Sequence, residues 1–530
     1  MDLHYLKPTI KAEPLVWRWY AWSYLISPVQ AAAYIVERHL KVMQSYIQNP
    51  QIHFEAVRNP KMLGGSFIDY ETNRSEEIKD LIAFTKKECR SLITLNEDLK
   101  EFTRLFVREA QGDSLEEMYK KIPDSLKGMI ELTYDLNNHP NIRLLEYFFY
   151  KKYYSSKNQT IALSNLTDDN RKFILSTPRL DQEDEVYLDV SFCDSRLDDL
   201  FKMKDNPSSL NDIVSMFDIP ASKQLLFNSF FSTNPPLKLE DRNYKEQGIR
   251  IRYFGHACML IQTQSISILF DPVLSYDTQD TRLERYTFSD LPDQIDYVIV
   301  THNHQDHFIF ETLLQLRHKI KHIIFPANNK GSFQDPSIKL ILEHIGFQSL
   351  IELEEMQTVS LQDGLIFSLP FFGEHSDLSI HSKLSYCIKL FDYTLMFAAD
   401  SNNLDPFLYD HIVDCIGPID MLFLGMECVG APLSWVYGPL LSLPLNRDFD
   451  RNRTVSGSDY EKAWAIVKKL QCKKVYIYAM GQEPWLEYIL ALKYSPTSLQ
   501  IIESDKLINT CNQEGIECER LFGKKEWILK

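Results

Sequence analysis

The stretch that decides the fold is THNHQDH, residues 301–307, which follows directly on the apolar run DYVIV at residues 296–300. His302 and His304 are two positions apart, so in extended backbone their side chains point the same way. Asp306 and His307 come after the chain begins to turn and can face a second centre. One interpretation of this pattern, without any functional site, is a run of surface histidines. Its position just past a strand favours a site for two adjacent metal ions instead.

Around this motif the chain alternates strand-like and helix-like segments. Short apolar runs predict strands at residues 249–254, 257–262, 265–270, 297–300, 322–325, 365–369, 386–390, 395–398, 421–424 and 475–478. Helical spacing predicts helices at residues 310–318, 337–345 and 459–470. The last helix opens with a predicted capping box of Ser458 and Glu461. Strands with interspersed helices predict an α/β layered domain from about residue 248 onward.

The first half of the chain has a different texture. Apolar residues at three- and four-residue spacing predict helices within residues 15–48 and 76–110. The aromatic run VWRWYAW at residues 16–22 is expected to pack as a helix on the N-terminal core, or else to form a subunit interface. Prolines at 235 and 236 and the charged stretch after them mark a boundary. We therefore predict a mixed α+β domain at residues 1–245 and the metal domain at residues 246–530.

Composition narrows the possible functions. The 530 residues are 44% hydrophobic and 25% charged, which is a normal globular balance. The formal net charge of −16 disfavours binding to nucleic acid or to an anionic membrane. Nine cysteines without a CxxC pair, and a start without an apolar leader, predict a cytoplasmic protein that lacks disulfides. Prolines and polar residues interrupt the uncharged runs at 19–36 and 428–445, so we expect no membrane span.

Residues 302–307 match in full the HxHxDH motif of the metallo-β-lactamase superfamily, which the chain resembles over residues 249–530. The run GHAC at residues 255–258 and the strand end FDP at residues 270–272 fit the same pattern. The resemblance implies an αβ/βα sandwich with the metals at one edge of its sheets. His256 is not a ligand in the superfamily, and we interpret it as a buried, hydrogen-bonded histidine. The alternative is a role behind the metal ligands.

Two positions depart from the hydrolase pattern, which usually adds a His, a bridging Asp and a final His. Asp400 corresponds to the bridging Asp. Where the first His is expected the chain reads FFGEHS, residues 371–376, in which normally only one of Glu374 and His375 can reach a metal. The final His is absent, because the last histidine of the chain is His411. The lost imidazole leaves a site rich in carboxylates, which suits iron or manganese better than a zinc pair.

The carboxylate-rich site, the chain length and the long N-terminal extension resemble the diiron β-hydroxylases related to the enzyme of chloramphenicol biosynthesis. This resemblance implies two iron ions, O2 as co-substrate, and hydroxylation of the β-carbon of an aminoacyl thioester on a carrier domain of a nonribosomal peptide synthetase. It also implies homodimerisation through the N-terminal domain. Carried over, it assigns one iron to His302, His304 and Glu374, the other to Asp306 and His307, and the bridge to Asp400.

Further residues are candidates around this centre. Glu427 follows the strand at residues 421–424 and is either a further metal ligand or a capping acid. Trp435 and Tyr386 are candidates for lining a substrate channel. A basic patch for the carrier domain is expected among Arg282, Arg285, Arg447, Arg451 and Arg453. We predict no nucleophile or general base beyond the metal centre. No GxGxxG run follows a strand, so we expect an external electron donor.

Two other functions remain open from the sequence. The first is a dizinc or dimanganese hydrolase of an ester, lactone or phosphodiester, in which Glu427 or Glu483 replaces the missing His. The second is a degenerate domain that serves as a scaffold. Six intact candidate ligands argue against the scaffold, and the missing final His argues against the hydrolase.

Overall fold

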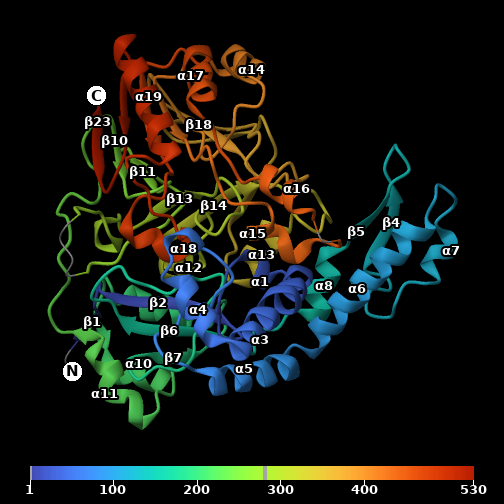
Figure 1. Ribbon diagram of the computed structural model, residues 1–530. Coiled ribbons are helices and arrows are strands. Elements are labelled where there is room, and N and C mark those ends of the chain that lie inside the picture. The colour runs from blue at the N-terminus through green and yellow to red at the C-terminus, as the bar shows by residue number, and fades with distance from the viewer. Residues whose placement is uncertain (1–2, 279–282, 444) are drawn as a thin grey trace.

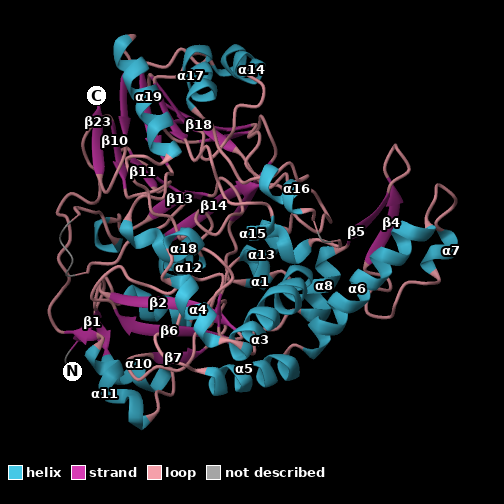
Figure 2. Cartoon of the chain, in the orientation of Figure 1, coloured by secondary structure: helices cyan, strands magenta, loops and turns pink. Residues whose placement is uncertain are grey.

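The computed structural model of the chain describes residues 3–278, 283–443 and 445–530. Figure 1 shows the C-terminal half, coloured yellow to red, above the N-terminal half, coloured blue to green. In the C-terminal half two mixed sheets lie face to face, and Figure 2 shows their strands in magenta between flanking helices.

The first sheet contains the strand that precedes the histidine motif. Its order is β15-β14-β13-β12-β11-β10-β23. Its strands are β10 (Ile249–Tyr253), β11 (Met259–Gln262), β12 (Ser267–Phe270), β13 (Ile295–Ile299), β14 (Ile320–Pro326), β15 (Leu350–Leu353) and β23 (Lys525–Leu529). Strands β12 to β15 run parallel, with β15 at the edge of the sheet, and the inner strands β12 to β14 are rich in isoleucine and valine, as strands covered on both faces are.

The second sheet has the order β16-β17-β18-β19-β20-β21-β22. Its strands are β16 (Thr358–Ser360), β17 (Gly364–Leu369), β18 (Ser385–Leu390), β19 (Tyr393–Phe397), β20 (Met421–Gly425), β21 (Lys474–Tyr478) and β22 (Glu517–Arg520). The core between the sheets is aromatic: the ring centroids of Phe270 and Phe397 are 4.3 Å apart, and those of Phe397 and Phe423 are 4.8 Å apart. This packing fixes the strand ends that carry the site.

Helices cover the outer faces and complete the predicted αβ/βα sandwich. They are α12 (Phe310–Leu316), α13 (Ile338–His344), α14 (Phe407–Ile416), α15 (Ser434–Tyr437), α16 (Arg447–Asn452), α17 (Tyr460–Lys469), α18 (Glu487–Leu490) and α19 (Leu499–Gln513). The predicted capping box is wrong. Asp459 caps α17 by accepting a hydrogen bond from the Lys462 backbone N–H at 3.0 Å, because Ser458 is buried and bonded to the loop after β19.

The N-terminal half contains three small sheets and a group of helices. Its strands are β1 (Leu3–Leu6), β2 (Ile10–Val16), β3 (Trp19–Tyr20), β4 (Ile130–Tyr134), β5 (Pro140–Leu144), β6 (Gln159–Asn165), β7 (Val186–Asp189), β8 (Ser208–Ser209) and β9 (Phe231–Ser232). Its helices are α1 (Ser23–Ile26), α2 (Pro28–Tyr34), α3 (Leu40–Gln48), α4 (Pro50–Val57), α5 (Ser75–Glu88), α6 (Arg90–Glu109), α7 (Glu116–Tyr119), α8 (Glu146–Tyr153), α9 (Arg196–Lys202), α10 (Leu210–Met216) and α11 (Ala221–Ser229).

The expectation of a helix through residues 15–22 is wrong. The chain makes a tight hairpin there, in which Val16 pairs with Trp19 and the turn residues Trp17 and Arg18 have φ of 51° and 73°. The aromatic run is buried inside its own chain, where Trp19 stacks on His39 with 3.8 Å between ring centroids. It is therefore neither a helix nor a subunit interface.

The two halves are joined by a common hydrophobic core and by buried polar contacts. Glu311 of α12 accepts hydrogen bonds from Tyr20 at 2.8 Å and Arg171 at 2.7 Å. Because the core is continuous, the boundary between residues 245 and 246 stays a prediction. Among the described residues no helix is long and apolar enough to span a membrane.

Candidate metal centre

The site lies where strand ends of both sheets meet. The histidine motif follows β13 of the first sheet, and Asp271 follows the adjacent parallel strand β12. Asp400 comes three residues after β19 of the second sheet. A side chain just past the end of a strand is no longer covered by the sheet. Side chains that follow strands of both sheets can therefore converge on one point. These residues are all buried.

One group of potential ligand atoms comes from His302, His304 and Glu374, which lie within 4.8 Å of one another. The Nδ1 of His304 is 2.7 Å from the Oε1 of Glu374. Glu374 reaches this position because its loop is tightly turned: Gly373 and Glu374 have φ of 71° and 66°. A side chain on Gly373 would meet Asn402 at 2.5 Å, so this turn requires glycine.

A second group comes from His302, His307 and Asp400, and a third from His256, Asp306 and His307. The Nε2 of His307 is 3.0 Å from the Oδ2 of Asp400 and 3.6 Å from the Oδ2 of Asp306. The same Asp400 oxygen is 3.9 Å from the Nε2 of His302. Asp400 therefore lies within reach of both His302 and His307, as a bridging carboxylate must.

The unpartnered polar atoms of this cluster fit a pair of metal ions. Among the described residues, the Nε2 of His302 and the Oδ1 of Asp400 are buried and have no hydrogen-bond partner. Leaving such atoms unsatisfied costs about 1–3 kcal/mol each. Three imidazoles and three carboxylates in one buried cluster, with orphaned atoms inside it, form a donor set suited to iron.

The neighbouring charges show how strongly the cluster attracts cations. Burial alone would raise the pKa of Asp306, but His307 and His256 hold that pKa well below its usual value. Burial would lower the pKa of His307, but Asp400, Asp306 and Asp271 raise it well above its usual value. The carboxylates thus stabilise positive charge at the centre of the site.

Two side chains that orient the candidate ligands were missed by sequence reasoning. Asp271 accepts hydrogen bonds from the Thr301 backbone N–H at 2.7 Å and from the Nδ1 of His307 at 2.8 Å. The Tyr437 hydroxyl is 2.8 Å from the Nε2 of His304. The FDP run served to end a strand and to support the superfamily resemblance, but it did not place Asp271 beside His307. No sequence pattern near Tyr437 indicates its contact with His304.

Two further histidines contact the candidate ligands. His256 is buried and its Nε2 is 3.1 Å from the Oδ2 of Asp306, so it is buried and hydrogen-bonded as predicted, and its role behind the metal ligands stays a prediction. The Nδ1 of His375 is 2.5 Å from the Oε2 of Glu374, and its ring stacks on His304 with 4.4 Å between centroids. His375 thus supports Glu374.

The position of the missing final His holds no substitute ligand. Met480 lies in the core that packs against the second sheet. Glu483 accepts a hydrogen bond from the hydroxyl of Tyr253 at 2.5 Å. Glu427 lines the cavity beside the cluster, outside the three close groups of ligand atoms in the described residues. Burial, with Asp400, Asp306 and Glu374 nearby, raises the pKa of Glu427 well above its usual value.

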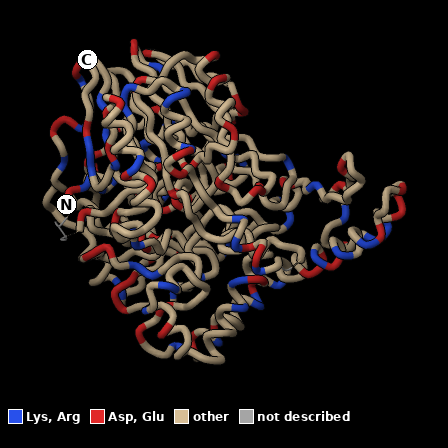
Figure 3. Tube along the Cα trace, turned by 45° about the horizontal axis from the view of Figure 1, so that its top comes forward, with Lys and Arg blue, Asp and Glu red and all other residues tan. Residues whose placement is uncertain are grey.

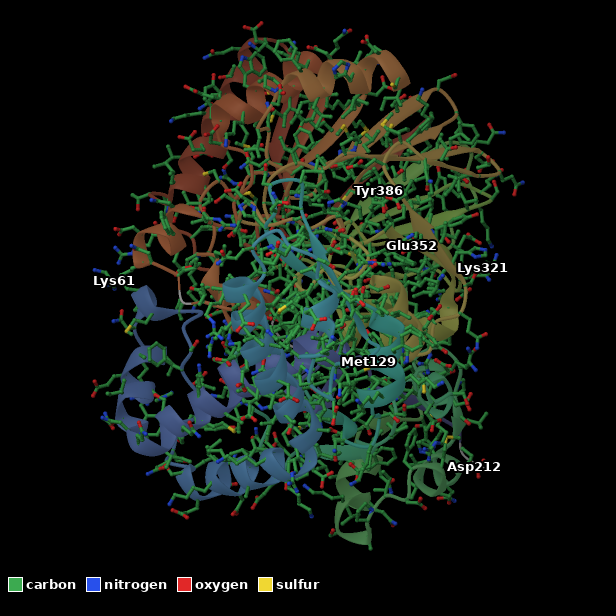
Figure 4. The ribbon with its side chains drawn as sticks, turned by 90° about the vertical axis from the view of Figure 1, so that its right-hand side faces the viewer. Lys61, Met129, Asp212, Lys321, Glu352 and Tyr386 are labelled. Carbon is green, nitrogen blue, oxygen red and sulfur yellow. The ribbon has the colours of Figure 1, made fainter. Side chains whose placement is uncertain are left out.

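A cavity of about 270 Å³ leads to the candidate ligands. Its wall is mostly apolar and includes Trp435, Val455 and Leu490. The N-terminal half contributes Leu63 and Gly64, and the Trp435 indole donates a hydrogen bond to the Gly64 carbonyl at 2.9 Å. Figure 4 shows Lys61, just before them, where the blue N-terminal helices approach the orange C-terminal ribbon. Tyr386 is not in this wall: its hydroxyl bonds to Val300 within the core.

Some arginines of the predicted basic patch are held in contacts within the chain, and others are exposed. Arg285 is held by Asp169 at 2.7 Å, and Arg453 donates to the Ser376 carbonyl at 2.7 Å. Arg447 and Arg451 are exposed on α16. Arg282 lies outside the described residues. Figure 3 shows both signs of charge spread over the surface.

The sandwich fold and the paired histidine–carboxylate cluster define a dinuclear metal protein of the metallo-β-lactamase fold. Residues 5–235 match the family described as the diiron non-heme beta-hydroxylase N-terminal domain, and residues 250–359 match the beta-lactamase superfamily domain. The chain is 34% identical over 522 residues to the 4-amino-L-phenylalanyl-[CmlP-peptidyl-carrier-protein] 3-hydroxylase of Streptomyces venezuelae, covering 97% of this chain and 98% of that one.

Solved structures agree with this match. The crystal structure of CmlA, a diiron beta-hydroxylase from Streptomyces venezuelae, has a TM-score of 0.93 and 33% identity, covering 100% of both chains. A point mutant of CmlA has a TM-score of 0.91 and 32% identity, covering 99% of this chain and 100% of that one. The chain therefore belongs to the diiron non-heme β-hydroxylase family. It is a hydroxylase with a diiron cofactor, and the hydrolase alternative is not supported.

Proposed function

We propose that the protein hydroxylates the β-carbon of an amino acid held as a thioester on a carrier domain of a nonribosomal peptide synthetase. The observation that carries this proposal is the match over nearly the whole chain to a hydroxylase whose name specifies an aminoacyl carrier-protein substrate. The cavity supports it, because its apolar wall extends from the candidate ligands to Leu63 and Leu492. Such a shape suits an extended arm with an apolar end.

The proposed ligands follow the groups of atoms described above. One iron would be held by His302, His304 and Glu374 and the other by Asp306 and His307, with Asp400 as a ligand available to both. Glu427 faces the same cavity and is proposed as a further ligand. When bound, the two irons supply reductive activation of O2, with electrons from a separate donor protein. Asp271 keeps the Nδ1 proton of His307 in place, and the apolar wall excludes water.

We also propose that the N-terminal domain, residues 1–245, forms a homodimer. In Figure 1 the outer end of α6, with α7 and the hairpin of β4 and β5, projects as an arm from the body. Leu136 at the hairpin tip is fully exposed, and Val107 and Tyr119 are also exposed on the arm. An arm with apolar tips suits contact with a second chain. Ultracentrifugation is expected to show a dimer, which Leu136→Asp weakens. A wild-type monomer at micromolar concentration would contradict this.

A reducing compartment is part of the proposal. The nine cysteines are all free in the structure. Free thiols in this number suit the cytoplasm, where carrier domains and their synthetases also act.

The decisive experiment compares a carrier-bound substrate with the free amino acid. The iron-loaded protein, a chemical or protein reductant and O2 are incubated with a carrier domain loaded with 4-aminophenylalanine. Mass spectrometry is expected to show one added oxygen atom on the carrier-bound amino acid, labelled when labelled oxygen gas is supplied. The free amino acid should stay unmodified. Zinc as the bound metal, or hydrolysis of the thioester without oxygen insertion, would refute the proposal.

A further inference from the structure

A second cavity reaches the candidate metal centre by another route. It has a volume of about 280 Å³. Its wall consists of Gly373, Glu374, Ser376, Asp377, Asn402, Leu404, Cys428, Asn452, Thr454, Ser456, Gly457, Asp459 and Lys462. Among the described residues, Glu374 alone lines both this cavity and the apolar one. The proposed ligand Glu374 therefore separates two spaces of opposite character.

A pair of chain segments forms the partition between the two cavities. Residues 453–457 run antiparallel to residues 427–433: the Val455 N–H donates to the Ala431 carbonyl at 2.8 Å, and the Gly457 N–H donates to the Glu427 carbonyl at 2.9 Å. Successive side chains of an extended segment point to opposite sides. Accordingly Val455 lines the apolar cavity, while Thr454 and Ser456 line the second cavity.

The close contact of these segments depends on glycine. A side chain on Gly430 would lie 1.4 Å from the Val455 carbonyl oxygen. The backbones can therefore approach only because residue 430 has no side chain. This approach closes the partition between the cavities.

The second cavity has the polar groups that ordered water needs. The Thr454 and Ser456 hydroxyl oxygens are 2.5 Å apart, and Lys462 donates to the Asn402 side chain at 2.9 Å. Ser376 is 3% exposed, and within the described part of the chain its hydroxyl has no hydrogen-bond partner. A buried hydroxyl without a partner, beside a polar space of this size, is a site for bound water. Exposed residues Asp377 and Asn452 connect the cavity to solvent.

Hydroxylation consumes protons and releases water. Each turnover takes one O2, two electrons from the donor protein and two protons. It breaks the O–O bond and one C–H bond, forms one C–O bond and releases one water. The substrate's C–H bond supplies the other two electrons that reduce O2. While the aminoacyl arm fills the apolar cavity, water is displaced from it, and away from the candidate ligands its wall offers few groups that exchange protons.

We propose that the polar cavity is the water-filled path by which protons reach the metal centre and product water leaves it, with Thr454 and Ser456 as its relay hydroxyls. The inference rests on the proposed function, since it assigns the apolar cavity to the carrier-bound substrate. Thr454 and Ser456 are positioning residues: they hold water and act through it.

The first test needs neither iron nor turnover. Cys428 lines the polar cavity and is partly exposed, whereas Cys258 is buried. Metal-free protein is treated at pH 9 with a small cationic methanethiosulfonate, and labelled peptides are measured by mass spectrometry. Cys428 should react about tenfold faster than the fully buried Cys258, because reaction needs access as well as thiolate. Equal protection of both thiols would overturn the water-filled path.

The second test measures the relay. Thr454→Val combined with Ser456→Ala keeps the shape of the partition and removes both hydroxyls. We expect kcat to fall about tenfold or more with a larger solvent isotope effect, while iron content and KM for the carrier-bound substrate stay unchanged. When Thr454→Ser replaces Thr454→Val in this double variant, most of kcat should be restored. Thr358→Val, on exposed strand β16, is the matched control.

The other possible results of these tests also decide for or against the proposal. Wild-type kcat and isotope effect in the double variant would overturn the relay. Loss of iron or a raised KM would show that the hydroxyls only support the structure, and would also overturn it. If the wild-type protein fails to modify any carrier-bound amino acid, the proposed function fails instead, and the labelling of Cys428 still decides whether the polar cavity is open to water.

Discussion

At the scale of single residues, a local turn determines how Glu374 and His375 face the proposed metal site. Adjacent side chains normally point apart, and the sequence could not choose between them. In the structure the Oε1 of Glu374 faces His304 at 2.7 Å, while His375 packs behind it. The choice depends on left-handed backbone at Gly373 and Glu374, which only the surrounding fold can impose.

This arrangement predicts unequal effects of two neighbouring substitutions. Glu374→Ala should remove the iron that we assign to His302 and His304, because a carboxylate ligand is lost. His375→Ala should weaken iron binding by about 10- to 100-fold without abolishing it, as expected for a group that contacts the ligands. Iron per chain is measured by mass spectrometry after dialysis against a weak chelator, with thermal unfolding as the folding control. The reverse order would show that His375 is the ligand.

At the scale of elements, the sequence predicts what is locally encoded. The strands of the C-terminal half carry their own apolar runs, and the motif at residues 301–307 sits next to its strand, so both were predictable. The hairpin of β2 and β3 was not, because positive φ at Trp17 and Arg18 is unusual for such large residues. Asp271 and Tyr437 contact the motif across 36 and 133 residues of chain, which no local pattern encodes.

The start of α17 gives a prediction at this scale. Asp459 caps the helix, whereas the sequence favoured a box of Ser458 and Glu461. Asp459→Ala should lower the free energy of unfolding by about 1 kcal/mol. Glu461→Ala removes an exposed side chain and should change it by about 0.5 kcal/mol or less. Urea unfolding midpoints compare the two. A larger loss of unfolding free energy for Glu461→Ala would support the predicted capping box instead.

At the scale of the whole molecule, the two halves are joined by contacts of the partly buried Lys204. Lys204 of the N-terminal half lies 3.9 Å from the ring centroid of Phe288 and donates to the Gln315 side chain at 2.6 Å. Burial lowers the pKa of Lys204 to about 7, although Asp205 and Glu311 oppose the shift and Lys319 adds to it. The stability that this interface gives to the folded state should therefore depend on pH.

The sign of this sensitivity follows from proton binding. The unfolded chain keeps Lys204 protonated up to about pH 10.4, whereas the folded chain releases the proton near pH 7. Between these values the unfolded state binds more protons, so this residue makes the folded state more stable as pH rises, by up to about 1.4 kcal/mol per pH unit. Lys204→Met removes this contribution. The stability of the wild type relative to Lys204→Met, from urea unfolding, should therefore rise between pH 7 and pH 9. Lys202→Met, at a half-exposed side chain paired with Asp199, is the control and should show no such trend. A constant difference for Lys204→Met would mean that Lys204 stays charged between the two halves.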